Sequence, residues 1–375
     1  MKQPVILQVL PQLRAGGVER GTIEIAGAIA RAGMRALVAS AGGSMLPNLA
    51  YAGGEHITIP LTTKNPLTIW SNAAELEKII RKHKVDIIHA RSRAPAWSAL
   101  IAARRTKTPF VTTFHGVYGL SPEFKKHYNA VMTQGDRVIA ISNFVAEHII
   151  ANYPIDPTRM RIIHRGVDIN SFAPERIRHQ PMVELAAKWR VPDDLPLILM
   201  PGRITRWKGQ HVLVEALAKL PHRNFFCLLV GDDLGHPAYR KELEKMICDL
   251  GLESNARIAG NTSSMAEAYT LAEVVVCPSV EPEAFGRVPV EAQAMGRAVI
   301  STNHGGACET IIDGVTGLLV KPGDADELSK AIERILEMPA EQKQQLAENA
   351  IWHVRNNFSA EIMCSKTIEV YRELL

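Results

Sequence analysis

The chain has 375 residues, a length that suits two α/β domains of about 150–200 residues better than one. Apolar residues make up 46% and charged residues 22%, which excludes disordered and fibrous classes. No apolar run approaches the roughly 20 residues of a membrane span, and Pro11 and Arg14 interrupt the first apolar run too early for a signal peptide. Five cysteines without C-x-x-C spacing argue against a disulfide framework or a zinc site and favour a reducing cytoplasm.

The net charge of +4 is unevenly divided along the chain. Residues 1–175 contain 21 Lys and Arg against 12 Asp and Glu, a net charge of +9, and the remaining 200 residues carry −5. Basic residues cluster at 81–84, 104–107 and 125–126, so either this half meets an anionic surface or substrate, or the charges are merely scattered unevenly. Aromatic residues are not interleaved with the clusters, which argues against nucleic-acid binding.

Short apolar runs alternate with segments of helical periodicity in the first half. The expected strands are 5–10, 36–40, 86–90, 110–113, 137–141 and 161–164, and the expected helices are 19–32, 94–105 and 142–152. Apolar strands separated by helices are typical of a parallel sheet that is covered on both faces.

The pattern breaks between Asn170 and Pro196, where four prolines surround one helical stretch at 182–189. It resumes with expected strands at 197–200, 225–230, 274–277 and 298–302, and with expected helices at 209–220, 237–250 and 288–295. Three helical segments follow without strands, at 324–338, 340–356 and 359–375. We therefore expect an α/β protein of two doubly wound domains with a hinge near residues 168–180.

Two loops beyond strand ends carry residues suited to phosphate, and ligands bind at such ends of parallel sheets. Gly16 and Gly17 open the first helix, so their N–H groups can approach an anion, although a plain tight turn is the alternative. Arg203 and Lys208 follow the strand at 197–200 and match the oxygens of a diphosphate, unless they form only a solvated basic loop. The chain contains no G-x-G-x-x-G, which argues against a nicotinamide or flavin oxidoreductase.

Two glutamates flank the start of the helix expected at 288–295. Pro289 suits its first turn and Gly296 suits its end, so we expect Glu291 inside the helix and Glu283 in the preceding loop. A carboxylate accepts two hydroxyl donors, so the pair could hold two sugar diols. Alternatively, both residues only favour the helix dipole.

As a set, these segments resemble the retaining glycosyltransferases of family GT4, which have the GT-B fold. The resemblance extends along nearly the whole chain and rests on Gly16–Glu19, Thr113–Gly116, Ala140–Ser142, Gly166–Asp168, Gly202–Gly209, Val230–Asp232, Glu283-x7-Glu291, His304–Gly306 with Glu309, and Asp313–Gly317. It implies two Rossmann-like domains facing across a cleft. Residues 1–170, completed by a C-terminal helix at 357–375, would bind the acceptor, and residues 171–356 would bind the nucleotide sugar. His164-Arg165 stands where the family usually has Asn, and Glu281-Pro282 is a different lead-in to Glu283.

The resemblance also implies roles for single residues. Glu291 would bind the nucleotide ribose, and Glu283 with the backbone of Ala284, Phe285 and Gly286 would hold the donor sugar. Arg203 and Lys208 would neutralise the diphosphate, with Gly16 and Gly17 closing over it. His115, at a strand end, would lie beside sugar and acceptor, and a hydrogen-bonded core histidine is the alternative.

A metal is not expected. Asp324 and Asp326 form a D-x-D pattern, but Asp324-x-x-Glu327 at a helix start is also a capping box, and we expect the cap. The cationic pair Arg203 and Lys208 would take the place of a metal. No cofactor is implied, and the donor would be a UDP-, GDP- or ADP-sugar.

The resemblance therefore implies a retaining, metal-independent transferase that moves a hexose, such as mannose or glucose, to a glycolipid or oligosaccharide. Its motifs are most similar to bacterial lipopolysaccharide-core transferases, which indicates a cytoplasmic protein, free or peripheral on the inner face of the membrane.

Two alternatives stay open. One is an enzyme of the same fold with a small acceptor, such as a sugar phosphate synthase or a nucleotide-sugar epimerase. The other is a non-catalytic sugar-binding protein, which is disfavoured because Arg203, Lys208, Glu283, Glu291 and His115 are all present.

Overall fold

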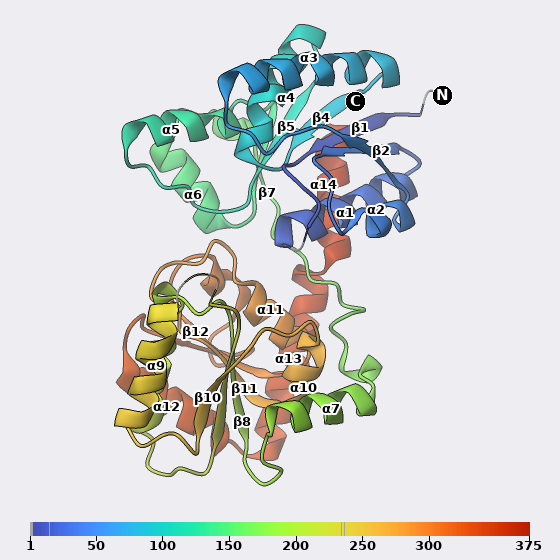
Figure 1. The fold of residues 1–375 in the computed structure, drawn as a ribbon. Coiled ribbons are helices and arrows are strands. Elements are labelled where there is room, and N and C mark those ends of the chain that lie inside the picture. Colours follow the sequence, from blue (N-terminus) through green and yellow to red (C-terminus); the bar gives the residue numbers. More distant parts are fainter. Residues whose placement is uncertain (1–2, 15, 234, 236) are drawn as a thin grey trace. The chain divides into compact units, whose positions relative to one another are not determined.

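The chain forms two compact units, each built on one parallel sheet (Figure 1). The computed structural model describes residues 3–14, 16–233, 235 and 237–375. The first unit comprises Met1–Gly166 together with Ala360–Leu375, and the second comprises Val167–Ser359. The sequence places these transitions near residues 170 and 357.

The first unit contains a seven-stranded sheet of order β3-β2-β1-β4-β5-β6-β7, in which every neighbouring pair is parallel. Its strands are β1 (Val5–Val9), β2 (Arg35–Ser40), β3 (Gly54–Thr58), β4 (Ile87–Ala90), β5 (Phe110–Phe114), β6 (Arg137–Ala140) and β7 (Met160–Ile162). Its helices are α1 (Gly17–Arg31), α2 (Leu46–Tyr51), α3 (Pro66–His83), α4 (Arg93–Thr106), α5 (Glu123–Asn129), α6 (Asn143–Asn152) and α14 (Ala360–Arg372), with 3₁₀ turns at Ala130–Thr133 and Pro157–Arg159.

The C-terminal helix α14 belongs to the first unit although it ends the chain. Tyr371 is fully buried and its hydroxyl lies 2.7 Å from Nδ1 of His89 in β4. Beyond the helix, Glu373 bonds to Arg137 in β6 and to Arg161 in β7, each at 2.6 Å. The two guanidinium groups lower the pKa of Glu373 to about 2. Tyr371 and Glu373 therefore bond this end of the chain to three strands of the first sheet.

The second unit contains a six-stranded sheet of order β10-β9-β8-β11-β12-β13, again all parallel. Its strands are β8 (Leu197–Pro201), β9 (Phe226–Val230), β10 (Ala256–Ala259), β11 (Ala272–Cys277), β12 (Ala298–Thr302) and β13 (Leu318–Val320). Its helices are α7 (His179–Trp189), α8 (Gln210–Ala218), α9 (Pro237–Asp249), α10 (Met265–Leu271), α11 (Arg287–Ala294), α12 (Ala325–Leu336) and α13 (Ala340–Asn357), with 3₁₀ turns at Pro174–Arg176, Arg206–Lys208 and Gly306–Thr310.

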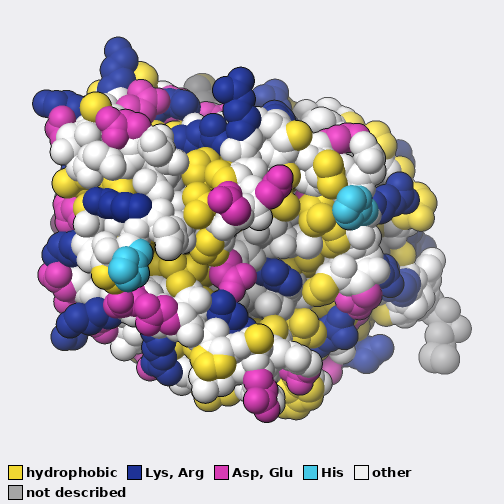
Figure 2. Space-filling view, turned by 90° about the horizontal axis from the view of Figure 1, so that it is seen from below, with side chains coloured by type: hydrophobic (Ala, Val, Ile, Leu, Met, Phe, Trp, Pro, Cys, Tyr) yellow, Lys and Arg dark blue, Asp and Glu magenta, His cyan; other side chains and the backbone are white. Residues whose placement is uncertain are grey.

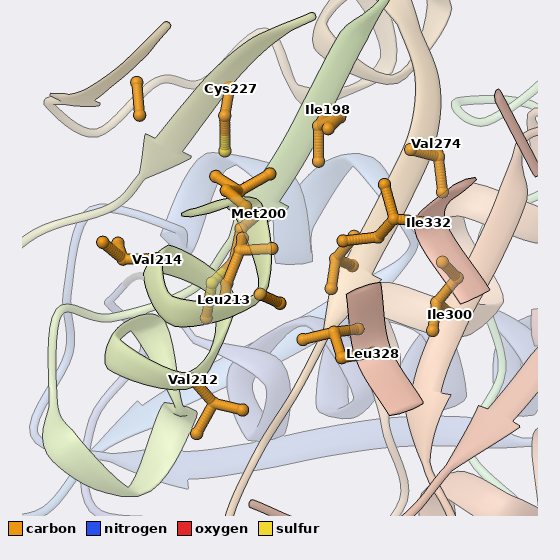
Figure 3. Close-up of a cluster of buried hydrophobic side chains, with 14 of the residues drawn as sticks. Ile198, Met200, Val212, Leu213, Val214, Cys227, Val274, Ile300, Leu328 and Ile332 are labelled. Atoms are coloured by element: carbon orange, nitrogen blue, oxygen red, sulfur yellow. The ribbon is translucent and has the colours of Figure 1, made fainter. Parts of the chain in front are cut away.

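Both faces of the second sheet are buried, because β8 and β9 consist of apolar residues throughout. One face packs Ile198 and Met200 against Leu213 of α8 and Ile332 of α12 (Figure 3). The other face packs Leu199 into a cluster with side chains of α7, α10 and α11. This doubly wound α/β arrangement confirms the predicted fold class.

In each sheet the strand order reverses between two central strands, β1 and β4 in the first and β8 and β11 in the second. Loops at the carboxyl ends of the strands flanking such a point form the usual ligand crevice. Gly16 and Gly17 follow β1, Arg203 and Lys208 follow β8, and Glu283 follows β11. The predicted site residues therefore stand at these two edges.

Candidate functional site

The loops after β8 and β11 pack directly on each other. Gly209 has φ +79°, and a Cβ there would lie 1.9 Å from the carbonyl oxygen of Pro278. The N–H of Val280 donates to the carbonyl of Trp207 over 2.8 Å. Only glycine permits this approach at position 209. The approach holds Lys208 beside the second loop.

Lys208 and Glu283 form a largely buried ion pair. Nζ of Lys208 lies 2.7 Å from Oε1 of Glu283, and the two side chains are 13% and 18% exposed. Oγ of Ser279 donates to the same oxygen over 2.6 Å. Burial raises the pKa of Glu283, but the Lys208 ammonium and the hydrogen bonds from Lys208 and Ser279 outweigh it and hold the pKa below its ordinary value of 4.5. Glu283 is therefore a carboxylate at neutral pH.

The backbone around Glu283 is fixed by the loop after β12. Gly306 N–H donates to the Glu283 carbonyl over 2.7 Å. Gly305 has φ +65°, and a Cβ there would lie 2.6 Å from the same carbonyl oxygen. Ala284 and Phe285 lead from Glu283 to Gly286, which precedes the first residue of α11 and provides no side-chain cap. Gly286 thus offers no side-chain acceptor to the N–H groups at the start of α11.

Glu291 lies inside α11, as predicted, and is 8% exposed. Its Oε2 accepts a hydrogen bond from the Tyr269 hydroxyl over 3.0 Å, and its Oε1 accepts one from Arg287 over 2.6 Å. Burial, followed by the charge of Glu291, raises the pKa of Tyr269 well above 10, so the hydroxyl stays a donor. The carboxylate is oriented from two sides.

Arg203 is exposed at the rim of the same edge. Its guanidinium carbon lies 5.8 Å from the ring centroid of Trp207, whereas Nζ of Lys208 lies 4.5 Å from that centroid. Gln210 donates to the Arg203 carbonyl over 2.8 Å and so fixes the backbone of the loop. The structure thus brings both predicted cations to one aromatic ring.

His115 follows β5 in the first unit. Both ring nitrogens are buried, and neither has a hydrogen-bond partner among the residues that the structure describes. A small cavity beside the ring is lined by Arg91 and Arg165. Burial, and then the charges of these two arginines, hold the pKa of His115 well below its ordinary value of 6.5. The ring is therefore neutral. Unlike a hydrogen-bonded core histidine, it has no hydrogen-bond partner among the described residues, so a bound ligand could provide one.

Gly16 and Gly17 stand at the start of α1, as the sequence predicts, while Ala15 beside them lies outside the described residues. A Cβ at Gly16 would lie 2.2 Å from Oε2 of Glu19, so this carboxylate is folded back against the helix start. Arg165 donates to the carbonyl of Gly17. Arg165 therefore joins the glycine turn to the cavity beside His115.

Sequence reasoning missed the residues that orient the predicted ones. Ser279, Tyr269 and Arg287 hold the two glutamates, and Arg91 and Arg165 flank His115. Arg287 stands four residues before Glu291, a helical spacing that the sequence shows.

The Asp324-x-Asp326 segment is a helix cap, as predicted. Oδ1 of Asp324 accepts from the N–H of Glu327 over 2.9 Å, and Asp326 pairs with Lys219 at 2.6 Å. Across residues 3–14, 16–233, 235 and 237–375, no three His, Cys, Asp or Glu side chains gather as metal ligands. Within the same residues, no helix has the length and apolar character to cross a bilayer.

Comparison with known proteins decides the family. Residues 183–352 match the family described as glycosyl transferases group 1, and residues 15–171 match glycosyltransferase family 4. A glycosyltransferase structure from Rickettsia africae ESF-5 is 42% identical, with a TM-score of 0.92 over 100% of this chain and 99% of that one. The chain is a group 1 glycosyltransferase of the GT-B fold.

Other relatives of this glycosyltransferase carry more specific names. D-inositol 3-phosphate glycosyltransferase 1 of Catenulispora acidiphila is 30% identical over 68% of this chain, and the match spans 65% of that protein's own length. Anabaena HepE, whose structure was determined with UDP and glucose, is 26% identical, with a TM-score of 0.83 over 98% of this chain and 99% of that one. The lipopolysaccharide glycosyltransferase WaaG, 19% identical with a TM-score of 0.73 over 97% of this chain and 99% of that one, shows the fold alone.

Proposed function

We propose that this glycosyltransferase transfers a hexose, with retention and without a metal, from a nucleotide diphospho-sugar to a glycolipid or oligosaccharide of the cell envelope. The observation that carries the proposal is the Lys208–Glu283 pair, with Arg203 and Glu291 at the same edge of the second sheet. Two cations and two carboxylates there provide for a diphosphate and for sugar hydroxyls respectively. Anabaena HepE, bound to UDP and glucose, supports a donor of this class.

In the proposed reaction the glycosidic bond to the diphosphate breaks, and negative charge grows on the departing phosphate. Lys208 and Arg203 stabilise that charge, and preorganised electrostatics of this kind is usually the largest catalytic term. Lys208 is held by Glu283 and stands near the Trp207 ring, so it needs little reorganisation. The acceptor oxygen bonds to the anomeric carbon on the face from which the diphosphate leaves. The departing phosphate oxygen itself accepts the proton of the acceptor hydroxyl.

Glu283 in this scheme is a hydrogen-bond acceptor rather than an acid or a nucleophile. Its Oε1 already accepts from Lys208 and Ser279, and its lowered pKa keeps it ionised. Glu291, oriented by Tyr269 and Arg287, would accept the ribose hydroxyls. His115, kept neutral by burial and by two arginines, would bond a sugar hydroxyl with one ring nitrogen.

We also propose that the first unit binds an anionic membrane surface through part of its basic clusters. The clusters at 81–84 and 104–107 lie at the C-terminal ends of α3 and α4, which connect parallel strands and therefore end at the amino edge of the sheet. Lys125 and Lys126 lie in α5, beyond β5 at the carboxyl edge. Figure 2 shows a further face of the molecule, on which basic and acidic side chains are interspersed. Because the clusters lie at opposite edges of the first sheet, a flat docking surface would include the clusters of one edge only.

A ligand screen tests the proposal. Thermal unfolding is followed with UDP-, GDP- and ADP-sugars in buffer containing EDTA, because a ligand that binds the folded state raises the midpoint. One of the three donors should stabilise the protein, and the anomeric configuration of the product, read by NMR, should match that of the donor. An inverted product would overturn the retaining mechanism, and no shift with any donor would favour a non-catalytic role.

A small acceptor is the second candidate. The name D-inositol 3-phosphate glycosyltransferase, shared by several relatives about 30% identical, favours it. Turnover with a water-soluble acceptor in the absence of detergent and lipid would distinguish it from a lipid-linked acceptor.

A further inference from the structure

A pocket of about 700 Å³ opens at the carboxyl edge of the first sheet. It lies wholly within the first unit, between the loops that follow β1, β3, β4 and β5 and the helix α5. The volume is that of a small-molecule site, and the place is beside the point where the strand order reverses. The proposed roles of the glycine turn and of His115 do not use this pocket.

Three cationic side chains line the pocket, and none of the described residues that line it is acidic. Lys64 comes from the loop after β3, Arg93 from the start of α4, and Lys125 from α5. They come from three separate elements, whereas the two basic clusters at the ends of α3 and α4 are runs in the sequence that complement helix dipoles. Convergent cations without a counter-ion favour an anionic ligand.

Arg93 is held in place before any ligand binds. Its Nη1 donates to Oδ1 of Asn129 over 2.8 Å, and the Asn129 amide donates in turn to the Gly119 carbonyl over 3.0 Å. Its guanidinium carbon lies 4.2 Å from the ring centroid of Tyr118. A guanidinium fixed in this way still has donors to spare for a planar or tetrahedral anion.

Two neutral groups reinforce the preference for an anion. The pocket includes Arg93 and Ala94, the first two residues of the 14-residue helix α4, and Ser92, which precedes the helix and makes no side-chain cap. The Ser92 side chain therefore does not accept a hydrogen bond from the N–H groups at the start of α4. The hydroxyl of Tyr128, a residue of the pocket wall, is buried and has no partner among the described residues.

The wall of the pocket is not polar throughout. Phe124 lines it and is 69% exposed. An exposed aromatic ring beside cations suits a ligand that joins an anionic group to a sugar ring or an apolar chain. Inorganic phosphate alone would leave this surface unused.

We propose that this pocket, lined by Lys64, Arg93 and Lys125, binds a phosphate ester carried by the acceptor. The inference rests on the proposed function, because it names the acceptor class of the same transferase. Two sources can supply such an ester, namely a soluble sugar phosphate and the headgroup of a lipid. Both sources present anionic phosphate oxygens to Arg93 and to the start of α4.

Binding to the full-length protein distinguishes the two sources. Calorimetric titration compares a hexose 6-phosphate with the unphosphorylated hexose, and phosphatidylglycerol in zwitterionic micelles with the micelles alone. The variants are Arg93→Gln and the double change Lys64→Gln with Lys125→Gln. The matched control is Lys82→Gln with Lys84→Gln, which removes two charges at the other edge of the sheet.

One of the two phosphate probes should bind, and each pocket variant should weaken it by at least tenfold while the control leaves it unchanged. If Arg93→Gln fails to fold, the double lysine variant decides. Failure of both phosphate probes to bind better than their neutral counterparts overturns the inference, and so does equal weakening by control and pocket variants.

Donor binding, measured on the same samples, keeps the two proposals separate. A nucleotide sugar that binds the pocket variants normally supports the division of roles. A protein that binds the phosphate probe but no nucleotide sugar contradicts the proposed function while the pocket assignment stands.

Discussion

Nζ of Lys208 lies 2.7 Å from Oε1 of Glu283, although 75 residues separate them in the chain. Their two loops follow β8 and β11, which are neighbours in the sheet where the strand order reverses. The topology of the sheet thus brings the two loops together. The close packing that Gly209 permits then places Lys208 beside Glu283.

Loss of either cation should slow the reaction. We expect Lys208→Ala and Arg203→Ala each to lower turnover by about 10²–10³-fold, the scale for removing one stabiliser of a developing anion. Steady-state kinetics with the best donor measures this. Lys219→Ala, which breaks the exposed pair with Asp326, is the matched control and should leave turnover unchanged. Near-normal turnover in both site variants would remove the diphosphate assignment.

Substitutions of the same two residues can distinguish an effect on folding stability from an effect on turnover. Lys208→Ala leaves the mostly buried carboxylate of Glu283 without its cation, which should cost about 1–3 kcal/mol of unfolding free energy. Adding Glu283→Gln removes that charge, so the double variant should regain stability and still fail in turnover. A double variant no more stable than Lys208→Ala would show that the ion pair does not set the cost.

Glu291 should act on donor binding. Glu291→Gln removes the charge that would accept the ribose hydroxyls, and we expect KM for the donor to rise about tenfold, the equivalent of 1.4 kcal/mol. Tyr269→Phe removes one of its two orienting bonds and keeps the carboxylate, so its effect should be smaller. Equal effects of the two changes would mean that orientation, not charge, is what the donor requires.

Chelation should not affect the enzyme. Arg203 and Lys208 are proposed to do the work of a metal, so EDTA should leave turnover intact. The test is an assay in EDTA, repeated after addition of magnesium or manganese. Activity lost in EDTA and restored by either ion would contradict the proposal.

His115 should make folding sensitive to mild acid. Its folded-state pKa lies well below 6.5, so between those two values the unfolded chain binds a proton that the folded chain does not. Its contribution to stability is therefore fully present above about pH 6.5 and is lost as the pH falls, with a limit of about 1.4 kcal/mol per pH unit. Unfolding midpoints at pH 7.5 and 5.5 should differ less in His115→Asn than in the natural protein. An unchanged difference would place the ring in solvent-like surroundings.

Membrane binding should depend on one edge of the first sheet. A flat bilayer contacts one edge at a time, and the proposed acceptor pocket lies at the edge of Lys125 and Lys126. Vesicle sedimentation should show binding to anionic but not neutral vesicles, weakened by salt and by changing both lysines to Ser. Each lysine contributes on the order of 1 kcal/mol at an anionic surface.

The control for this experiment is the change of Lys82 and Lys84 to Ser at the opposite edge, which should leave vesicle binding intact. Equal binding to anionic and neutral vesicles, or none to either, would make the charge asymmetry incidental.

The sequence predicted the buried strands within one or two residues, because unbroken apolar runs leave few alternatives. It missed β3, β10 and β13, and also the 18-residue helix α3. β3 (Gly-Glu-His-Ile-Thr) is an edge strand without a fully buried residue, and β13 has three residues, so neither gives a strong periodic signal. Prediction from sequence patterns depends on the length and burial of a strand, and these edge strands are short or incompletely buried.

The same limit applies to the site. Pro289 and Gly296 bracket a helix in the sequence, so the placement of Glu291 was predictable and is confirmed. The partners Ser279 and Tyr269 reach the glutamates through space, and a hydroxyl on a loop or a helix gives no sign of its target. Arg165 marks a departure from the family pattern, yet only the fold shows that it lines the cavity beside His115.

The helix α14 has a consequence for the order of synthesis. All seven strands of the first sheet are synthesised long before residues 360–375, because the second unit lies between them and those residues in the chain. Until Tyr371 and Glu373 emerge, His89, Arg137 and Arg161 lack the partners that they have in the finished protein. The first unit, although begun earlier, therefore cannot be completed before the whole second unit and residues 360–375 have been made.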